Sequence, residues 1–201
     1  MSGGYGTIPA MILRPVPPAG LLVILVSLAA CGGGDDDAAT VPDVDRVAAA
    51  VQTRDSAALL GLIGYEQVAC TSAPLDVGGP PPCRAGEEDG ALVDVVQAVQ
   101  CKGAYLRPSD VPNALQHFLD PRPVVYAAFE APETWESGEY AVVLTSSQQG
   151  RAVASQLVIE GGKVVLLDFG CGETPEEKIA DIDQGSFLIE PAEPSATPEA
   201  T

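Results

Sequence analysis

Residues 152–169 read Ala-Val-Ala-Ser-Gln-Leu-Val-Ile-Glu-Gly-Gly-Lys-Val-Val-Leu-Leu-Asp-Phe, and this stretch decides the fold. Two apolar runs, 152–159 and 163–169, are separated by the sequence Glu-Gly-Gly-Lys at 160–163, which is typical of a tight hairpin turn. The stretch therefore predicts two antiparallel strands.

Two more strands are predicted upstream, at 124–130 and 139–145. In the second of these, Tyr140, Val142 and Leu144 alternate with smaller or more polar residues. The link 146–150 is predicted to be a looser hairpin, so the last three strands form a meander and the first can pair at its edge. The expected sheet is therefore antiparallel, with about four strands.

Helix starts are predicted at four polar residues that can cap a first turn: Asp43, Asp55, Ser109 and Thr174. The first two helices carry apolar residues at a helical spacing, and the third does so before Asp120. Residues 91–99 are ambiguous, because their β-branched valines favour a strand while their spacing favours a helix. We prefer a helix there by a small margin.

The two short helices that open the domain are joined by Thr53-Arg54-Asp55. This pair resembles the start of the cone-shaped NTF2-like α+β domains. The resemblance implies an α+β fold in which short helices pack on the antiparallel sheet. We therefore expect an NTF2-like or cystatin-like domain that is tied by disulfides.

Leu28-Ala29-Ala30-Cys31 ends the apolar run 21–30 and resembles the lipobox of bacterial lipoproteins. The run is too short to span about 30 Å of hydrocarbon, but it suits a signal peptide. The resemblance implies that the Cys31 thiol receives a diacylglycerol and that Cys31 becomes the new N-terminus. The protein is then lipid-anchored and extracytoplasmic, on the cell membrane or the outer membrane.

The chain divides into four parts on this basis. Residues 1–30 are a signal peptide, for which we predict that translation begins at Met11, and 31–42 are a lipidated flexible tether. Residues 43–189 form a single α+β domain. The tail 190–201 consists mainly of Pro, Ala, Glu, Ser and Thr and is predicted to be disordered.

The net charge of −18 limits the possible partners. Nucleic acid and anionic lipid headgroups repel such a surface, so we expect no nucleic-acid partner. Attachment to the membrane must come from the lipid on Cys31.

Four cysteines remain after lipidation, and an even number in an exported domain predicts two disulfides. Of the three possible pairings we favour Cys70–Cys83, which closes a loop rich in proline and glycine, together with Cys101–Cys171. A zinc site is disfavoured, because the chain has no Cys-x-x-Cys motif and only one histidine, His117. We expect no metal and no cofactor.

The sequence contains no recognisable catalytic motif. His117 lies alone in a helix, and Trp135 is expected to fold over one end of the sheet. The function that we expect is a non-enzymatic binding module of the cell envelope, which binds an unknown envelope protein or small ligand. The alternatives are a carboxylate-dependent hydrolase, for which the 28 acidic residues offer many candidate pairs, and a structural envelope component.

Overall fold

The computed structural model describes residues 41–73 and 79–191. The predictions for the signal peptide, for Cys31, for the tether up to residue 40 and for the tail from residue 192 fall outside these residues. The helices are α1 (Pro42–Gln52), α2 (Ser56–Leu62), α3 (Val111–Leu119), α4 (Pro175–Lys178) and the 3-10 turn η1 (Gln184–Ser186). The strands are β1 (Glu66–Ala69), β2 (Leu92–Gln100), β3 (Lys102–Leu106), β4 (Val124–Glu130), β5 (Tyr140–Gln148), β6 (Arg151–Glu160), β7 (Lys163–Asp168) and β8 (Phe187–Ile189).

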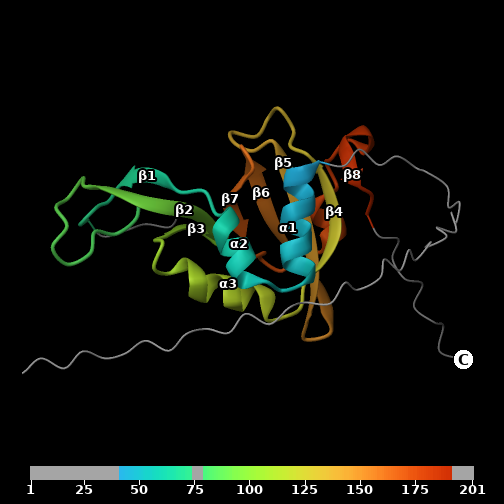
Figure 1. The fold of residues 1–201 in the computed structure, drawn as a ribbon, viewed down its shortest axis with the longest axis horizontal. Helices are drawn as coiled ribbons and strands as arrows, with labels where there is room; N and C mark the ends of the chain where they lie inside the picture. The colour runs from blue at the N-terminus through green and yellow to red at the C-terminus, as the bar shows by residue number, and fades with distance from the viewer. Residues whose placement is uncertain (1–40, 74–78, 192–201) are drawn as a thin grey trace, which may run out of the picture. The chain divides into compact units, whose positions relative to one another are not determined.

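The fold is α+β, built on one mixed sheet of eight strands (Figure 1). The strand order is β1-β2-β7-β6-β5-β4-β8, and β3 also pairs with β2. Every pair is antiparallel except β2 with β7, which run parallel. This corrects the predicted fold class: an NTF2-like or cystatin-like antiparallel sheet of about four strands is wrong, because β1, β2, β3 and β8 join the four predicted strands and β2 pairs parallel with β7.

The C-terminal meander lies where the sequence predicts it. β4 occupies 124–130 as expected, and β5, β6 and β7 are consecutive antiparallel neighbours. The turn between β6 and β7 is formed by Gly161 and Gly162, which both have positive φ angles (54° and 72°). Glycine adopts this backbone conformation without steric penalty, so the tight hairpin follows directly from the sequence.

The preference for a helix at 91–99 is wrong, because this segment is strand β2. β1 pairs with the first part of β2 (Leu92–Val95), and β3 and β7 both pair with its second part, where they lie on opposite edges. These neighbours satisfy the backbone of β2, and its β-branched valines fit the pleated surface. The helical spacing of the apolar residues is therefore overridden by tertiary pairing.

Helices α1, α2 and α3 cover one face of the sheet. Val47 and Val51 of α1 and Leu115 of α3 are buried in one apolar cluster with Leu157 of β6 and Leu167 of β7. Asp55 caps α2 by accepting a hydrogen bond from the Ala58 N–H at 2.9 Å, as predicted. The caps predicted for α1 and α3 are shifted, since Val41 and Asp110 occupy those positions and neither caps through its side chain.

The opposite face is covered only in part. A second apolar cluster lies over β4, β5 and the start of β6, where Trp135, Ile179, Ile182 and Phe187 pack against the sheet. α4 begins with the capping box expected at Thr174, in which Thr174 and Glu177 each bond the other's backbone. The remainder of this face, over β2, β7 and the second half of β6, stays open and forms a groove.

Candidate functional site

The groove consists of two adjoining hollows of about 480 and 610 Å³. Gln97, Glu136 and Ser137 line both hollows and therefore join them into one elongated depression. The first hollow lies toward α4, and the second lies toward Tyr65 and Tyr105. We call this depression the sheet groove.

A β-bulge in β7 decides which of its side chains line the sheet groove. Val158 pairs with Leu166 and Ile159 pairs with Val164, so Val165 is an extra residue on β7. Such an insertion changes the side on which the following residues emerge. Val164 and Leu167 are both fully buried in the helix-covered core, whereas Leu166 and Asp168 line the groove.

An ion pair closes the first hollow at its α4 end. Lys178 donates to Asp168 at 2.5 Å and to Glu173 at 3.1 Å, and Asp168 also accepts the Gly170 N–H at 2.8 Å. Burial lowers the pKa of Lys178, but its hydrogen bonds and charge contacts with Asp168 and Glu173 outweigh burial and raise the pKa above 10.5. Lys178 is therefore held as a cation whose charge is already neutralised.

Two glutamine amides face the first hollow without such partners. Gln156 of β6 is only 5% exposed, and Gln97 of β2 is half-buried. Neither side chain hydrogen-bonds another residue within the described part of the chain. No described buried side-chain N or O atom lacks a partner, so the unpaired amide of Gln156 reaches solvent in the hollow. A buried polar group usually has a partner, so an amide left open toward a hollow marks a place where a ligand can bind.

Trp135 forms part of the groove wall. It lies in the β4–β5 connection, and its ring meets that of Phe129 edge to face, with centroids 6.0 Å apart. As predicted, this tryptophan packs over the sheet. The prediction misses the second role of the side chain, which lines the first hollow next to Glu136 and Ser137.

The sheet groove is acidic. Six carboxylates and two lysines line it, a net charge of −4, and the carboxylates are Glu66, Glu136, Glu160, Asp168, Glu173 and Glu177. Burial raises the pKa of Tyr65 at the rim of the second hollow, so its phenol stays neutral at neutral pH. The groove can therefore accept hydrogen bonds and attract positive charge, but it repels anions.

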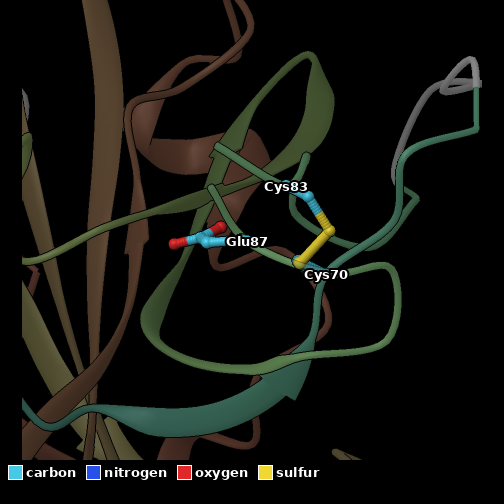
Figure 2. Close-up of side chains that lie close together, drawn as sticks. All are labelled: Cys70, Cys83 and Glu87. Atoms are coloured by element: carbon cyan, nitrogen blue, oxygen red, sulfur yellow. A yellow bond between two sulfur atoms is a disulfide. The ribbon is translucent and has the colours of Figure 1, made fainter. Parts of the chain in front are cut away.

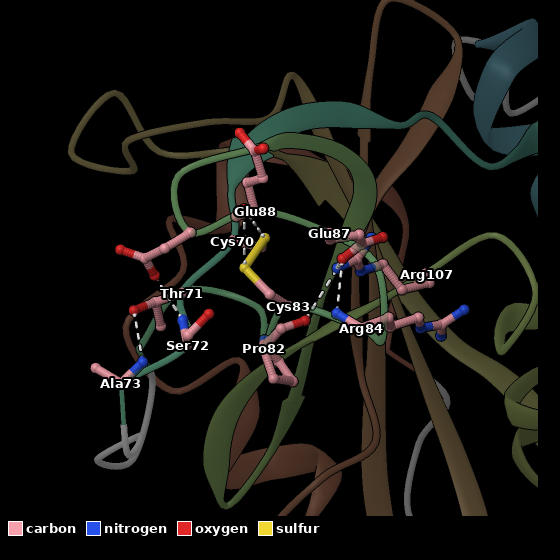
Figure 3. The surroundings of a disulfide bond; sticks show 11 residues. Cys70, Thr71, Ser72, Ala73, Pro82, Cys83, Arg84, Glu87, Glu88 and Arg107 are labelled. Carbon is pink, nitrogen blue, oxygen red and sulfur yellow. Dashed lines mark hydrogen bonds and ion pairs between the residues drawn. A yellow bond between two sulfur atoms is a disulfide. The ribbon is translucent and has the colours of Figure 1, made fainter.

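The predicted Cys70–Cys83 disulfide is present, with an S–S distance of 2.03 Å (Figure 2). Glu87 lies close enough for the three residues to resemble a metal-ligand cluster, with their ligand atoms within 4.8 Å. The two sulfurs are bonded to each other, however, and Glu87 forms an ion pair with Arg107 at 2.9 Å (Figure 3). The Arg107 hydrogen bond lowers the pKa of Glu87, so both groups stay charged and the cluster is a structural brace.

The second predicted disulfide, Cys101–Cys171, is not formed, and the expectation that no thiol remains free is wrong in this structure. Both cysteines are exposed beyond the last β2–β7 pair, Val99 with Asp168: Cys101 is the turn residue between β2 and β3, and Cys171 follows β7. They are nevertheless adjacent: a hydrogen bond with the Cys101 thiol is the main reason why the pKa of Cys171 rises to about 11. Their joining on oxidation stays a prediction, which peptide mapping without reduction would check after treatment with oxidised glutathione.

The other residues considered from the sequence do not coincide with the groove residues. His117 is exposed on α3, on the helix-covered side, and does not line the sheet groove. Gln97, Gln156 and Lys178 were missed as site residues. The only signal for Gln156 was a polar residue inside an apolar run that otherwise suits a buried strand.

No family model matches the chain, and no curated protein matches it either. Within the described residues, no helix combines the length and apolar character needed to cross a membrane.

Proposed function

We propose that this protein is a lipid-anchored extracytoplasmic module of the cell envelope that binds its ligand in the sheet groove. The anchor is the lipid on Cys31, as the resemblance of residues 28–31 to a lipobox implies. The domain then faces the envelope and recognises its ligand without chemical conversion.

One observation carries the binding role: the open part of the sheet holds a hollow of about 480 Å³ toward which the unpartnered amide of Gln156 is directed. A purely structural face would fill such a space with apolar side chains or would pair its polar groups. Concave sites lined by a few convergent polar groups and an aromatic side chain are the usual form of ligand sites.

The hydrolase alternative receives less support from the same groove. Carboxylate-dependent hydrolysis of a glycosidic bond needs two carboxyl groups that are available to the substrate. In the first hollow, Asp168 and Glu173 are bound by Lys178, and Glu177 is used in the capping box of α4. Glu136 is the one carboxylate of that hollow without such a bond among the described residues.

Site-specific photo-crosslinking in whole cells tests the binding role. A photoreactive residue at Ser137, which is exposed in the groove, should give an adduct, whereas the same residue at Ala49, which is exposed on α1, should not. The adduct at Ser137 should decrease when Gln156→Leu is added. Equal adducts at both positions, or an adduct at Ser137 that ignores Gln156→Leu, would count against the proposal.

Cys31→Ala tests the anchor separately. We expect the variant to lose the lipid mass and the cleavage before residue 31, and to leave the detergent phase in phase partitioning. A variant that keeps its lipid and is processed normally would remove the lipoprotein part of the proposal and leave the groove untouched.

A further inference from the structure

We infer that the sheet groove takes an elongated organic cation, a molecule with amine or guanidinium groups spaced along an apolar stem. This inference rests on the proposed binding function and specifies the chemical class of its ligand. The same chemistry occurs in two sources, a free polyamine and a basic peptide segment, which the experiment below distinguishes.

The acidic lining of the sheet groove favours a cationic ligand. The net charge of −4 around the groove comes from carboxylates that belong to four different parts of the chain: β1, the β4–β5 connection, the end of β6, and the region from the end of β7 to α4. Their field overlaps in a depression whose walls exclude part of the solvent, and this strengthens attraction for a positive ligand. An anionic ligand would instead be repelled along the whole groove.

The two groove lysines are already bonded to other groups of the protein, so they do not take the place of a bound cation. Lys178 is already neutralised by Asp168 and Glu173, and Lys163 donates to the Gly61 carbonyl at 2.9 Å. Glu136, by contrast, makes no ion pair with any described residue and lines both hollows. It is the carboxylate best placed to meet an incoming cation.

Gln156 provides the second, independent observation. The residue as a whole is only 5% exposed, and its amide lines the first hollow without a hydrogen-bond partner among the described residues. The amide oxygen can accept a hydrogen bond from an ammonium or guanidinium N–H, and bonds from a charged donor are stronger than neutral ones. A buried neutral acceptor beside an acidic wall thus suits a cationic donor.

Aromatic side chains line both hollows: Trp135 is in the first, and Tyr65 and Tyr105 are in the second. Aromatic rings attract organic cations through their faces and pack against the apolar stems between the charges. Because the two hollows share a wall at Gln97, Glu136 and Ser137, one extended ligand can contact both. The length of the groove therefore favours a ligand with several spaced charges over a small ion.

Trp135 is the only tryptophan in the chain, so its fluorescence reports directly on the first hollow. The full chain, purified in non-ionic detergent, would be titrated with spermidine and with the peptide Lys-Ala-Arg-Ala-Lys. The comparison probes are the neutral peptide Gln-Ala-Gln-Ala-Gln, maltotriose and citrate. We expect the two cationic probes to change the fluorescence and the other three to leave it unchanged, and we expect added salt to weaken the response.

Matched variants distinguish specific binding in the sheet groove from non-specific attraction to an acidic protein. Glu136→Gln should weaken cation binding about 3–10-fold, while Glu133→Gln should leave it unchanged, because Glu133 is exposed in the same connection but does not line the groove. Gln156→Leu should weaken it at least about tenfold, the lower end of the range for a hydrogen bond to a charged group. The tighter of the two cationic probes identifies the source, polyamine or peptide.

The results of these experiments separate the cation inference from the proposed binding function on which it rests. If a neutral probe binds with a Trp135 response and the cations do not, the cation inference is overturned while the binding function stands. Equal weakening by Glu133→Gln and Glu136→Gln also overturns it, since the attraction is then non-specific. If no probe alters Trp135 and the crosslink at Ser137 fails as well, both the inference and the proposed function fall.

Discussion

Gln156 and Leu157 are consecutive residues of β6 whose side chains point to opposite faces of the sheet. Leu157 is fully buried beneath the helices, within an apolar cluster contributed by α1, α2, α3 and the strands β2, β4, β5, β6 and β7. Gln156 is nearly as buried, but it faces the sheet groove and has no partner among the described residues. The two faces therefore reach similar burial with different chemistry.

The difference shows how one sheet can separate stability from recognition. The helix-covered face is filled with Val, Leu, Ile and Phe side chains, which gain from burial in proportion to their apolar area. The groove face keeps an ion pair, two open amides and an incomplete apolar cover. Substitutions of the apolar residues on the first face should affect mainly folding, and substitutions of the open amides on the second should affect mainly binding.

Leu157→Ala is expected to have the largest effect on folding. It removes a fully buried side chain and leaves a cavity under the helices, so the free energy of unfolding should fall by about 2–5 kcal/mol. A urea melt followed by circular dichroism measures this loss. A decrease below about 0.5 kcal/mol would mean that the helix-covered face does not carry the stability that its packing indicates.

Lys178→Met should have an intermediate effect, about 1–3 kcal/mol, because it leaves the Asp168 carboxylate, whose side chain is 10% exposed, without its cation. The effect should depend on pH. The folded-state pKa of Lys178 is raised above 10.5, so the stabilisation is fully present below pH 10.5 and is lost as the pH rises through the folded value.

Urea melts of the wild type and of Lys178→Met at about pH 8 and at a series of values above pH 10.5 would test this. The control is Lys163→Met, which removes a groove lysine that bonds a neutral carbonyl. A difference between the wild type and Lys178→Met that stays constant with pH would show that the ion pair does not act as described.

Gln156→Leu should change the free energy of unfolding by less than about 1 kcal/mol, because it breaks no hydrogen bond between described residues and puts an apolar side chain of similar size in a largely buried position. Its binding defect should be large by comparison. Paired urea melts and Trp135 titrations measure both quantities. A loss of stability as large as that of Leu157→Ala would break the distinction between the two faces.

Cys101→Ala should leave stability nearly unchanged and alter only the reactivity of Cys171. The thiol of Cys171 has a pKa of about 11, so at neutral pH it is a poor nucleophile. Removing Cys101 removes the main cause of the raised pKa, so alkylation of Cys171 by iodoacetamide at about pH 8 should become several-fold faster. Mass spectrometry of the labelled peptide gives the rate, and an unchanged rate would refute the contact between the thiols.

Much of the meander could be predicted from the sequence, because its signals are local. The Gly161-Gly162 turn, the alternation in β5 and the capping box at Thr174 each depend on residues close together in the chain. The Cys70–Cys83 disulfide is local as well, since its loop is short, rich in proline and glycine, and has few large apolar residues.

The remainder depends on partners distant in sequence. β2 is a strand because β7 and the N-terminal strands flank it, and its own residues 91–99 are ambiguous. The extra residue Val165 in β7 directs Asp168 toward the groove, and no sequence pattern distinguishes it from its apolar neighbours. The groove residues therefore had to be found in three dimensions, where Gln97, Gln156 and Lys178 come together.

The parallel pairing of β2 with β7 also has a kinetic consequence. Gln97 pairs with Leu166, so the sheet cannot close until the chain has been synthesised almost to its last strand. Contacts this far apart in sequence slow folding, because the entropy cost of closing a long loop arises before the strand pairing can stabilise the chain. The β1–β3 segment with its disulfide therefore joins the meander late, and the sheet groove, which needs both β2 and β7, is complete only after that step.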